Sequence, residues 1–273
     1  MRRKNRRLIE EVQIELPVDK WIDKSTKIFA IGSCFAIGLR RWLKARGFNV
    51  LPIEEELAWY NTFSLRNEFH LALRGRTTKD EHYTGAKWLD PFRFPCVADT
   101  QDGLLEKQRH IDSQVIHGVQ QAELIVITLG LVECHNWNGR VLCTAPSRNH
   151  GIKAKFFIAD YIENLANCNQ MLRYLREANP AARVILTVSP VPLRYTFAGH
   201  DHEIANTESK AILRAVAGHV ERLHDFVTYF PSFELASLVD RKSRYIRDGR
   251  HISPVVVESI LSLFETTYVR EDV

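Results

Sequence analysis

Five short apolar runs, spaced along a chain of 273 residues, constrain the fold more than any other feature of the sequence. None of them alternates apolar with polar residues, a pattern typical of strands buried on both faces of a parallel sheet. The runs cover residues 27–31, 48–51, 124–129, 184–188 and 226–230. Helical periodicity recurs between them, which predicts an α/β fold with a three-layer, doubly wound parallel sheet. We expect about five strands in the order 2-1-3-4-5.

Helix start and stop signals support this interpretation. Ser33 stands where the first apolar run ends and an amphipathic helix begins, and Gly47 is suited to end that helix. Further helices are predicted over about 160–178 and about 203–223. The last helix has Ser253 as its expected N-cap and Pro254 at its first position.

The chain divides into a basic lead-in and one domain. Residues 1–25 form a tail and lead-in, and residues 26–273 a single domain with an aromatic-rich insertion at about 52–120. That insertion could cover a substrate site or simply extend the core. Five of the chain's basic residues lie in the first seven positions, with no aromatic residue between them. We therefore expect a solvated tail and no nucleic-acid partner.

Composition excludes several classes of protein. No segment approaches the roughly 20 apolar residues that span a bilayer, so we expect no membrane span. The five cysteines are odd in number, widely spaced and without a CxxC pair, which argues against disulfides and zinc and favours the cytoplasm. The stretch His200-Asp201-His202-Glu203 could bind a metal, but a polar loop is the simpler interpretation. We expect no metal and no cofactor.

A serine, a histidine and an aspartate are predicted to meet at one edge of the sheet. Ser33 follows the first strand, and Asp248 and His251 precede the last helix. Ligands bind at the carboxyl ends of parallel strands, so this edge is the expected site. Ser33 would be the nucleophile, His251 its base and Asp248 the acid that orients the base. Backbone N–H groups at Ser33 and Cys34 could stabilise an oxyanion, and Cys34 is a rival nucleophile.

Several motifs, in order, carry a family resemblance. The pentapeptide Gly32-Ser33-Cys34-Phe35-Ala36 resembles the motif that gives the GSCFA family its name. Further blocks that resemble the family occupy residues 61–65, 128–133, 187–193, 209–214 and 248–251, and the resemblance covers about residues 26–255. The family is similar to the SGNH (GDSL-like) hydrolases. The resemblance implies an SGNH-like, flavodoxin-like fold in which Ser33, Asp248 and His251 correspond to the catalytic serine and the terminal DxxH pair.

One block departs from the SGNH pattern. The third SGNH block is GxND-like and supplies an asparagine to the oxyanion hole, whereas residues 130–133 here read Gly-Leu-Val-Glu. Asn61, in the second block, is our expected substitute for that side-chain donor. Gly130 would let the backbone approach the site, and Glu133 could orient a neighbour or contact substrate. Each of these residues could instead be structural.

The predicted function is hydrolysis or transfer of an acyl group through an acyl-serine intermediate. We expect an O-acyl substrate, most simply the O-acetyl ester of a small molecule or a glycan. Aromatic side chains of the insertion could stack on sugar rings or belong to the core: Trp59, Tyr60, Trp88 and Phe92. The alternative is a non-catalytic module with an SGNH-like fold that binds a glycan or a protein. The missing asparagine favours that alternative, whereas the intact Ser33, Asp248 and His251 favour an enzyme.

Overall fold

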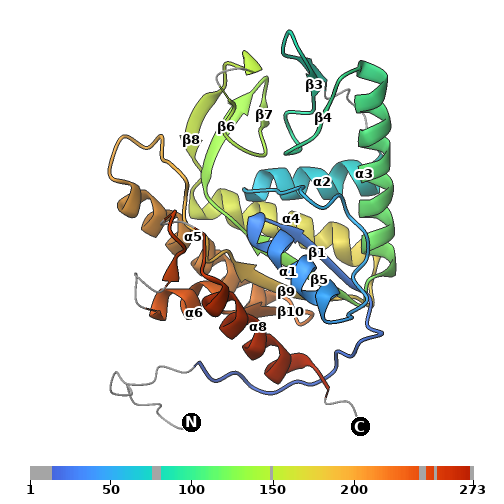
Figure 1. The fold of residues 1–273 in the computed structure, drawn as a ribbon, viewed down its shortest axis with the longest axis vertical. Helices are drawn as coiled ribbons and strands as arrows, with labels where there is room; N and C mark the ends of the chain where they lie inside the picture. The colour runs from blue at the N-terminus through green and yellow to red at the C-terminus, as the bar shows by residue number, and fades with distance from the viewer. Residues whose placement is uncertain (1–13, 76–80, 148–149, 240–243, 249–250, 271–273) are drawn as a thin grey trace.

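A four-stranded parallel sheet forms the centre of the molecule in the computed structural model (Figure 1). The structure describes residues 14–75, 81–147, 150–239, 244–248 and 251–270. The strands are β1 (Ile28–Gly32), β5 (Leu124–Leu129), β9 (Arg183–Val188) and β10 (Val227–Phe230), in the order β1-β5-β9-β10. This sheet confirms the predicted parallel α/β fold.

The predicted second strand is the exception. Residues 48–51 lie beside β1 as expected, but only one bridge forms, between Ile28 and Val50. The Val50 N–H donates to the Phe48 carbonyl at 3.0 Å, so the backbone turns back on itself. Pro52 then has no N–H to extend the ladder. The sheet therefore has four strands where about five were expected, and residues 48–51 lie at the edge beside β1, as the expected order places them.

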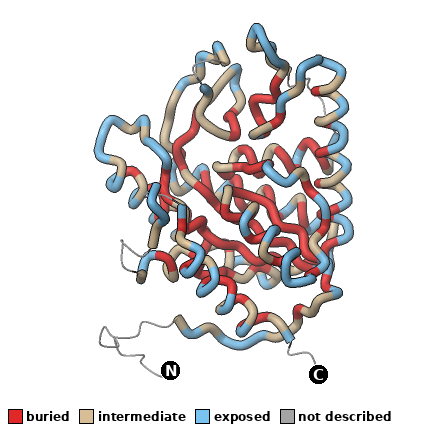
Figure 2. The backbone as a smooth tube through the Cα atoms, viewed as in Figure 1, coloured by how far each residue is buried: buried red, intermediate tan, exposed pale blue. Residues whose placement is uncertain are grey.

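The side chains of β1 alternate between two hydrophobic cores. Ile28 and Ala30 pack in a cluster that also contains side chains of α1 (Cys34–Ala45), α6 (Ser232–Leu238) and α8 (Pro254–Tyr268). Phe29 and Ile31 point to the opposite face of the sheet and pack in the second cluster. The helices that contribute to it are α2 (Thr62–Arg74), α3 (Gln101–Gln121), α4 (Tyr161–Ala178) and α5 (His202–Leu223). Helices thus cover both faces, and Figure 2 shows burial concentrated in the sheet between them.

Local capping explains where several helices begin. Ser33 is the N-cap of α1, and Asp160 forms a capping box with Glu163 at the start of α4. Ser253 precedes α8 with Pro254 in its first turn, as predicted, although the Ser253 hydroxyl makes no cap hydrogen bond. Among the described residues, none of the helices is long and apolar enough to cross a membrane.

Two small antiparallel sheets extend beyond the central sheet (Figure 1). The first lies in the insertion and contains β2 (His82–Tyr83), β3 (Trp88–Leu89) and β4 (Val97–Ala98). The second follows β5 and contains β6 (Glu133–Trp137), β7 (Arg140–Val141) and β8 (Lys155–Ile158), in the order β7-β6-β8. The sequence analysis did not predict this second insertion.

A buried ion pair holds the first insertion together. The Arg93 guanidinium donates to Glu68 at 2.5 and 2.8 Å and also contacts Asp112. The indole N–H of Trp59 donates to the same Glu68 carboxylate at 3.0 Å. Glu68 lies on α2 and Asp112 on α3, so one cation joins two helices to the loop before β4. Apolar side chains of α2 and α3 pack in the second hydrophobic cluster, so the insertion extends the core and also presents a loop to the site described below.

Candidate functional site

Ser33 occupies a sharp turn between β1 and α1. Gly32 has φ +131°, and a Cβ atom there would lie 2.3 Å from the Thr128 carbonyl oxygen. The Ser33 N–H donates to that same carbonyl at 3.0 Å, and the Ser33 and Thr128 hydroxyl oxygens lie 3.1 Å apart. Ser33 is only 1% exposed. Only glycine at position 32 lets the strand come this close to β5, so the turn fixes the hydroxyl against the sheet edge.

Gly130 lies directly against the serine. A Cβ atom on Gly130 would lie 3.2 Å from the Ser33 Cβ and 2.4 Å from the Tyr60 carbonyl oxygen. The Leu131 N–H donates to that Tyr60 carbonyl at 2.8 Å, which fixes the segment that leaves β5. Among the described residues, the Gly130 N–H has no hydrogen-bond partner. A backbone donor beside the serine is what an oxyanion hole requires.

Two buried residues of α5 hold this segment, and the sequence analysis gave neither of them a role. The Lys210 ammonium donates to the Gly130 carbonyl at 2.7 Å, and the Ser209 hydroxyl accepts from the Val132 N–H at 3.0 Å. The signal was present, because a lysine lies on the buried face of a predicted helix and within a family block. Buried lysines are rare unless they are paired.

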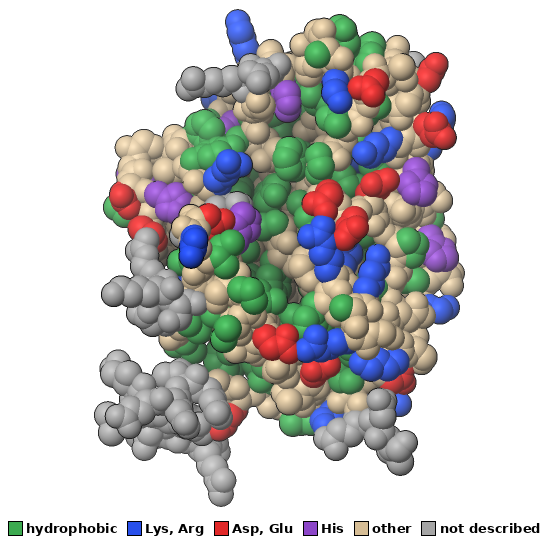
Figure 3. Space-filling view, viewed as in Figure 1, with side chains coloured by type: hydrophobic (Ala, Val, Ile, Leu, Met, Phe, Trp, Pro, Cys, Tyr) green, Lys and Arg blue, Asp and Glu red, His purple; other side chains and the backbone are tan. Residues whose placement is uncertain are grey.

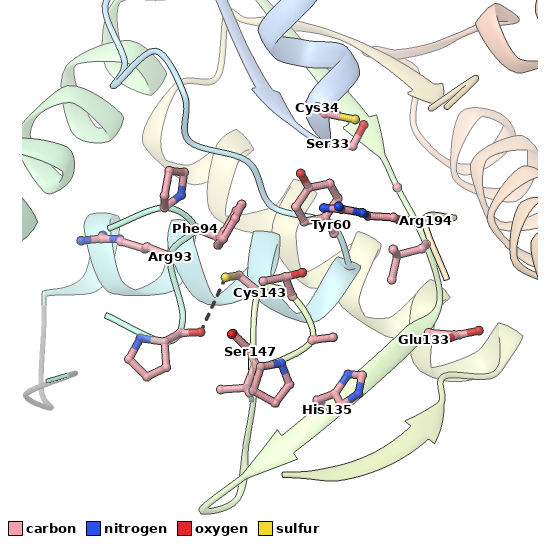
Figure 4. A pocket seen from close by; sticks show the side chains of 18 of the residues that line it. Ser33, Cys34, Tyr60, Arg93, Phe94, Glu133, His135, Cys143, Ser147 and Arg194 are labelled. Atoms are coloured by element: carbon pink, nitrogen blue, oxygen red, sulfur yellow. Dashed lines mark hydrogen bonds between the residues drawn. The ribbon is translucent and has the colours of Figure 1, made fainter. Parts of the chain in front are cut away.

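A cavity of about 600 Å³ opens beside Ser33. Figure 4 places Ser33 and Cys34 at one end of it and Glu133 and His135, from β6, at the other. Side chains from segments far apart in the sequence contribute to the walls, and these segments are 89–97, 130–135, 142–147 with His150 and Ile152, and 189–197. Figure 3 shows hydrophobic side chains gathered along a hollow near the middle of this face. The volume is that of a small-molecule site.

Glu133 fixes one rim of the cavity. Its carboxylate is buried, accepts from the Phe197 N–H at 3.0 Å and contacts the Thr196 hydroxyl. The ring of His135, two residues further along β6, packs edge-on against Phe197. Burial of His135 lowers the pKa of its imidazole, an effect that the nearby Glu133 carboxylate partly opposes. Glu133 thus orients the loop that follows β9.

Asn61 is held by structural contacts. Its Oδ1 accepts from the Ser64 N–H at 2.8 Å and caps α2, while its Nδ2 donates to the Leu142 carbonyl at 2.8 Å. Tyr60, not Asn61, lines the cavity. A role for Asn61 as an oxyanion donor stays a prediction, and the backbone of Gly130 is the better-placed donor.

Asp248 and His251 form a pair of their own. The imidazole Nδ1 contacts the Asp248 carboxylate, which also accepts from the His251 N–H at 2.9 Å. Their side chains are 42% and 52% exposed, respectively, and neither lines the cavity. Within the described residues, the Ser33 hydroxyl bonds to Thr128 and to the Phe35 N–H, not to His251. The structure therefore brings Asp248 and His251 together, as predicted, but shows no hydrogen bond between His251 and Ser33 within the described residues.

Three cysteines line the cavity: Cys34, Cys96 and Cys143. Cys34 is half-buried beside Ser33, whereas the other four cysteines of the chain are buried free thiols. Burial raises the pKa of the Cys96 and Cys168 thiols to about 12, which makes them poor nucleophiles. Burial also raises the pKa of the Cys143 thiol. Cys34, which is less buried and adjoins Ser33, is therefore the cysteine best placed to compete with it.

Most of the aromatic residues singled out in the sequence lie away from the cavity surface. Trp59 and Phe92 are buried, and only Tyr60 of that group lines the cavity. Three other aromatic side chains that line it are 41%, 51% and 48% exposed: Phe94, Tyr195 and Phe197. Phe94 lies in the insertion at about 52–120, which was expected to cover a substrate site or extend the core. Tyr195 and Phe197 lie outside that insertion and were not predicted as rim residues.

The histidine cluster near residue 200 has structural contacts. Asp201 caps α5 by accepting from the Glu203 N–H at 2.8 Å. His202 Nε2 lies 2.6 Å from the Leu193 carbonyl oxygen. These contacts anchor the loop between β9 and α5, the same loop that Glu133 holds from the other side.

Comparison with solved structures gives distant likenesses. One is a family 3 carbohydrate esterase from Clostridium thermocellum, with 9% identity and a TM-score of 0.41, covering 89% of this chain and 95% of the other. Another is a family 3 carbohydrate esterase from Talaromyces cellulolyticus, with 11% identity and a TM-score of 0.43, covering 88% and 94%. A third is a candidate GDSL-like lipase from Parabacteroides merdae, with 12% identity and a TM-score of 0.40, covering 92% and 97%.

Comparison with protein families identifies the family of this chain. No curated protein matches the chain. The sequence profile of the GSCFA family matches residues 27–264, which include the serine turn, both insertions and most of α8. The chain belongs to the GSCFA family.

Proposed function

We propose that this protein is a serine esterase or acyltransferase that acts on an O-acyl substrate in the cavity beside Ser33. One observation carries the proposal. A serine hydroxyl at the start of a helix lines a cavity of about 600 Å³, next to a backbone N–H that has no partner among the described residues. A nucleophile and an oxyanion donor at one point are the minimum for acyl transfer.

The reaction would proceed in two steps, acylation of Ser33 and then deacylation. The Ser33 Oγ attacks the ester carbonyl, His251 accepts the hydroxyl proton, and the alcohol leaves with that proton as the C–O bond breaks. Water, or a second alcohol, then attacks the acyl-serine while His251 takes its proton. The bond between the acyl carbon and Ser33 Oγ breaks, the proton passes from His251 to Oγ, and a carboxylic acid or a new ester leaves. Asp248 would orient the imidazole through the contact that the pair already makes. Ester hydrolysis and acyl transfer share this intermediate and differ only in the acceptor.

The oxyanion would bind to backbone groups. Alternation along β5, continued by one residue, turns the Gly130 N–H to the same side as the Thr128 carbonyl, toward β1 and Ser33. The start of α1 adds the positive end of a helix dipole. A backbone donor at Gly130 would replace the asparagine that SGNH enzymes place two residues further along, where this chain has Val132.

The acyl group would be acetyl, and the alcohol would belong to a carbohydrate-like molecule. The exposed rings of Phe94, Tyr195 and Phe197 around the cavity support this assignment, because aromatic faces pack well on sugar rings. The Asp248–His251 pair must approach Ser33 for turnover, and catalytic hydrogen bonds often tighten only when substrate is bound.

A binding module without catalysis is the second candidate. The exposed position of His251, away from the lining of the cavity, is the observation that favours it. Under this proposal the same cavity would recognise an acylated ligand without turning it over.

Labelling with a serine-reactive fluorophosphonate tests both candidates. We expect the wild-type protein and the Cys34→Ala variant to be labelled and the Ser33→Ala variant to remain unlabelled. Ser189→Ala is a matched control, because Ser189 is a second buried serine that lines the same cavity. Labelling that survives in Ser33→Ala but disappears in Cys34→Ala would overturn the serine assignment. A wild-type protein that resists the probe and hydrolyses no aryl acetate would support the binding module.

A further inference from the structure

The loop between β9 and α5 is held rigidly along the rim of the cavity. At Leu193, the N–H donates to Asn206 Oδ1 at 3.2 Å and the carbonyl oxygen lies 2.6 Å from His202 Nε2. Three residues later, Glu133 binds the Thr196 hydroxyl and the Phe197 N–H. The backbone is thus fixed on both sides of residues 194 and 195.

Arg194 and Tyr195 project from this fixed segment. Both are exposed and both line the cavity, and Figure 4 shows the Arg194 side chain extending across it. Within the described part of the chain, no hydrogen bond or ion pair involves the Arg194 guanidinium. Because the backbone that carries this cation is already held, a ligand that binds Arg194 does not have to order the loop as well.

The other charged groups that line the cavity already have protein partners. Arg93 is buried in its ion pair with Glu68, and Lys210 is bonded to the Gly130 carbonyl. Of the two carboxylates, Glu133 accepts from the rim loop and Asp90 accepts from the Phe92 N–H and the Gln108 amide. Among the described lining residues, Arg194 is therefore the charge that remains for a ligand.

We propose that Arg194 selects substrates whose alcohol portion carries an anionic group, a carboxylate or a phosphate, near the acylated oxygen. The acyl group would lie at Ser33, and the anion would accept hydrogen bonds from the guanidinium fork. The aromatic rim would contact the ring or chain between the two groups. This inference rests on the proposed esterase function and narrows it to acylated acids, such as esters of acidic sugars.

The test uses a matched set of substrates. Phenyl acetate, 4-acetoxybenzoate and 4-acetoxyphenyl phosphate share an acetyl ester and differ in having no anion, a carboxylate or a phosphate. The ratio of kcat/KM for each anionic ester to that for phenyl acetate is measured for the wild-type protein and for Arg194→Gln, Arg194→Lys and Arg222→Gln. Arg222 is an exposed arginine near the far end of α5, about 30 Å along the helix from the rim loop, and serves as the matched control.

We expect Arg194→Gln to lower that ratio about tenfold or more, the loss typical of one charge-assisted hydrogen bond. Arg194→Lys would restore part of it, and Arg222→Gln would leave it unchanged. Raising the salt concentration would lower the wild-type ratio, because an exposed cation is screened. The larger of the two anionic ratios identifies the anion. Ratios that are the same in wild type and Arg194→Gln would overturn the inference.

A binding experiment separates this inference from the function on which it rests. In the Ser33→Ala background, calorimetry would compare the affinity for 4-acetoxybenzoate with that for phenyl acetate, with and without Arg194→Gln. If the anionic ester binds more tightly only when Arg194 is present, while the wild-type protein hydrolyses none of the esters, the esterase proposal fails and the role of Arg194 stands. If the esters are hydrolysed but affinity does not depend on Arg194, the role of Arg194 fails and the esterase proposal stands.

Discussion

The serine turn and the Asp248–His251 pair are built in opposite ways. Ser33 is almost fully buried, with β1, β5 and α1 all fixing its position. Asp248 and His251 are about half exposed, and the Asp248 carboxylate contacts both the imidazole and the backbone N–H of His251. One half of the proposed site is thus part of the sheet, whereas the other half is a surface motif before α8.

A catalytic triad needs a fixed serine and a histidine oriented toward it. Here different parts of the structure would meet these two requirements. The sheet edge fixes Ser33, the proposed nucleophile, next to Gly130, the proposed oxyanion donor. His251 contacts the local Asp248 carboxylate, and under the proposed mechanism its approach to Ser33 would be a separate event. The comparison predicts that substitutions at the serine turn affect both folding and activity, whereas substitutions in the pair affect activity almost alone.

The largest expected effect is on turnover. Ser33→Ala and His251→Ala should each lower kcat/KM for phenyl acetate by at least about 1000-fold, because the residues of a triad act as a unit. The double variant should be no worse than either single variant, as steady-state kinetics would reveal. Losses that multiply in the double variant would mean that the two regions do not act in one reaction.

The next largest effect is on stability at the serine turn. Gly32→Ala should lower the free energy of unfolding by about 3–5 kcal/mol, because the added Cβ would overlap the Thr128 carbonyl and alanine disfavours a φ of +131°. Gly38→Ala is the control, since nothing lies within 4 Å of its added Cβ and the residue is inside α1. Urea denaturation should show Gly38→Ala to be more stable by about 0.5–1 kcal/mol. Equal destabilisation at both positions would refute the close contact at Gly32.

A smaller effect distinguishes the two halves directly. Ser33→Ala should cost about 1 kcal/mol of stability through loss of the α1 cap and the Thr128 contact. His251→Ala should change stability by no more than about 0.5 kcal/mol, because its side chain is half exposed. Chemical denaturation of both variants measures the difference in their free energies of unfolding. A His251→Ala variant as destabilised as Ser33→Ala would contradict the prediction.

The smallest expected effect concerns pH. Burial lowers the pKa of His135, so the unfolded chain binds a proton more readily than the folded protein does. The stability that this group contributes is present above the unfolded value of about 6.5 and is lost as the pH falls toward the folded pKa. His135→Phe should therefore reduce the loss of stability between pH 7.5 and pH 5 in urea titrations. An unchanged pH dependence would contradict the assignment.

The sequence could predict the features that depend on local signals and on parallel-sheet topology. The four sheet strands are long apolar runs, and Ser33 and Asp160 carry their own capping signals. Parallel topology also predicted that Ser33, Asp248 and His251 would meet at the carboxyl edge of the sheet. Ser33 lines the cavity there, together with Gly130 and Ser189, whereas Asp248 and His251 do not line it. These outcomes need no knowledge of distant contacts.

The rest depends on contacts between segments far apart in the chain. The strands β2, β3, β4 and β7 have two residues each, too few to show a periodic pattern. Residues 48–51 look like a strand by composition, yet a local turn at Val50 limits their pairing. The rim formed by Arg194 and Tyr195 depends on Glu133, some sixty residues away in sequence. No local signal could reveal that anchor.

The bond between Lys210 and the Gly130 carbonyl has a practical consequence. Lys210 is only 2% exposed, so an amine-reactive reagent would reach it only when α5 separates from the end of β5. Its rate of modification, followed by mass spectrometry, would report local opening at the sheet edge without any engineered label. Lys210 could thus serve as a chemical probe of the residue, Gly130, whose N–H is the proposed oxyanion donor.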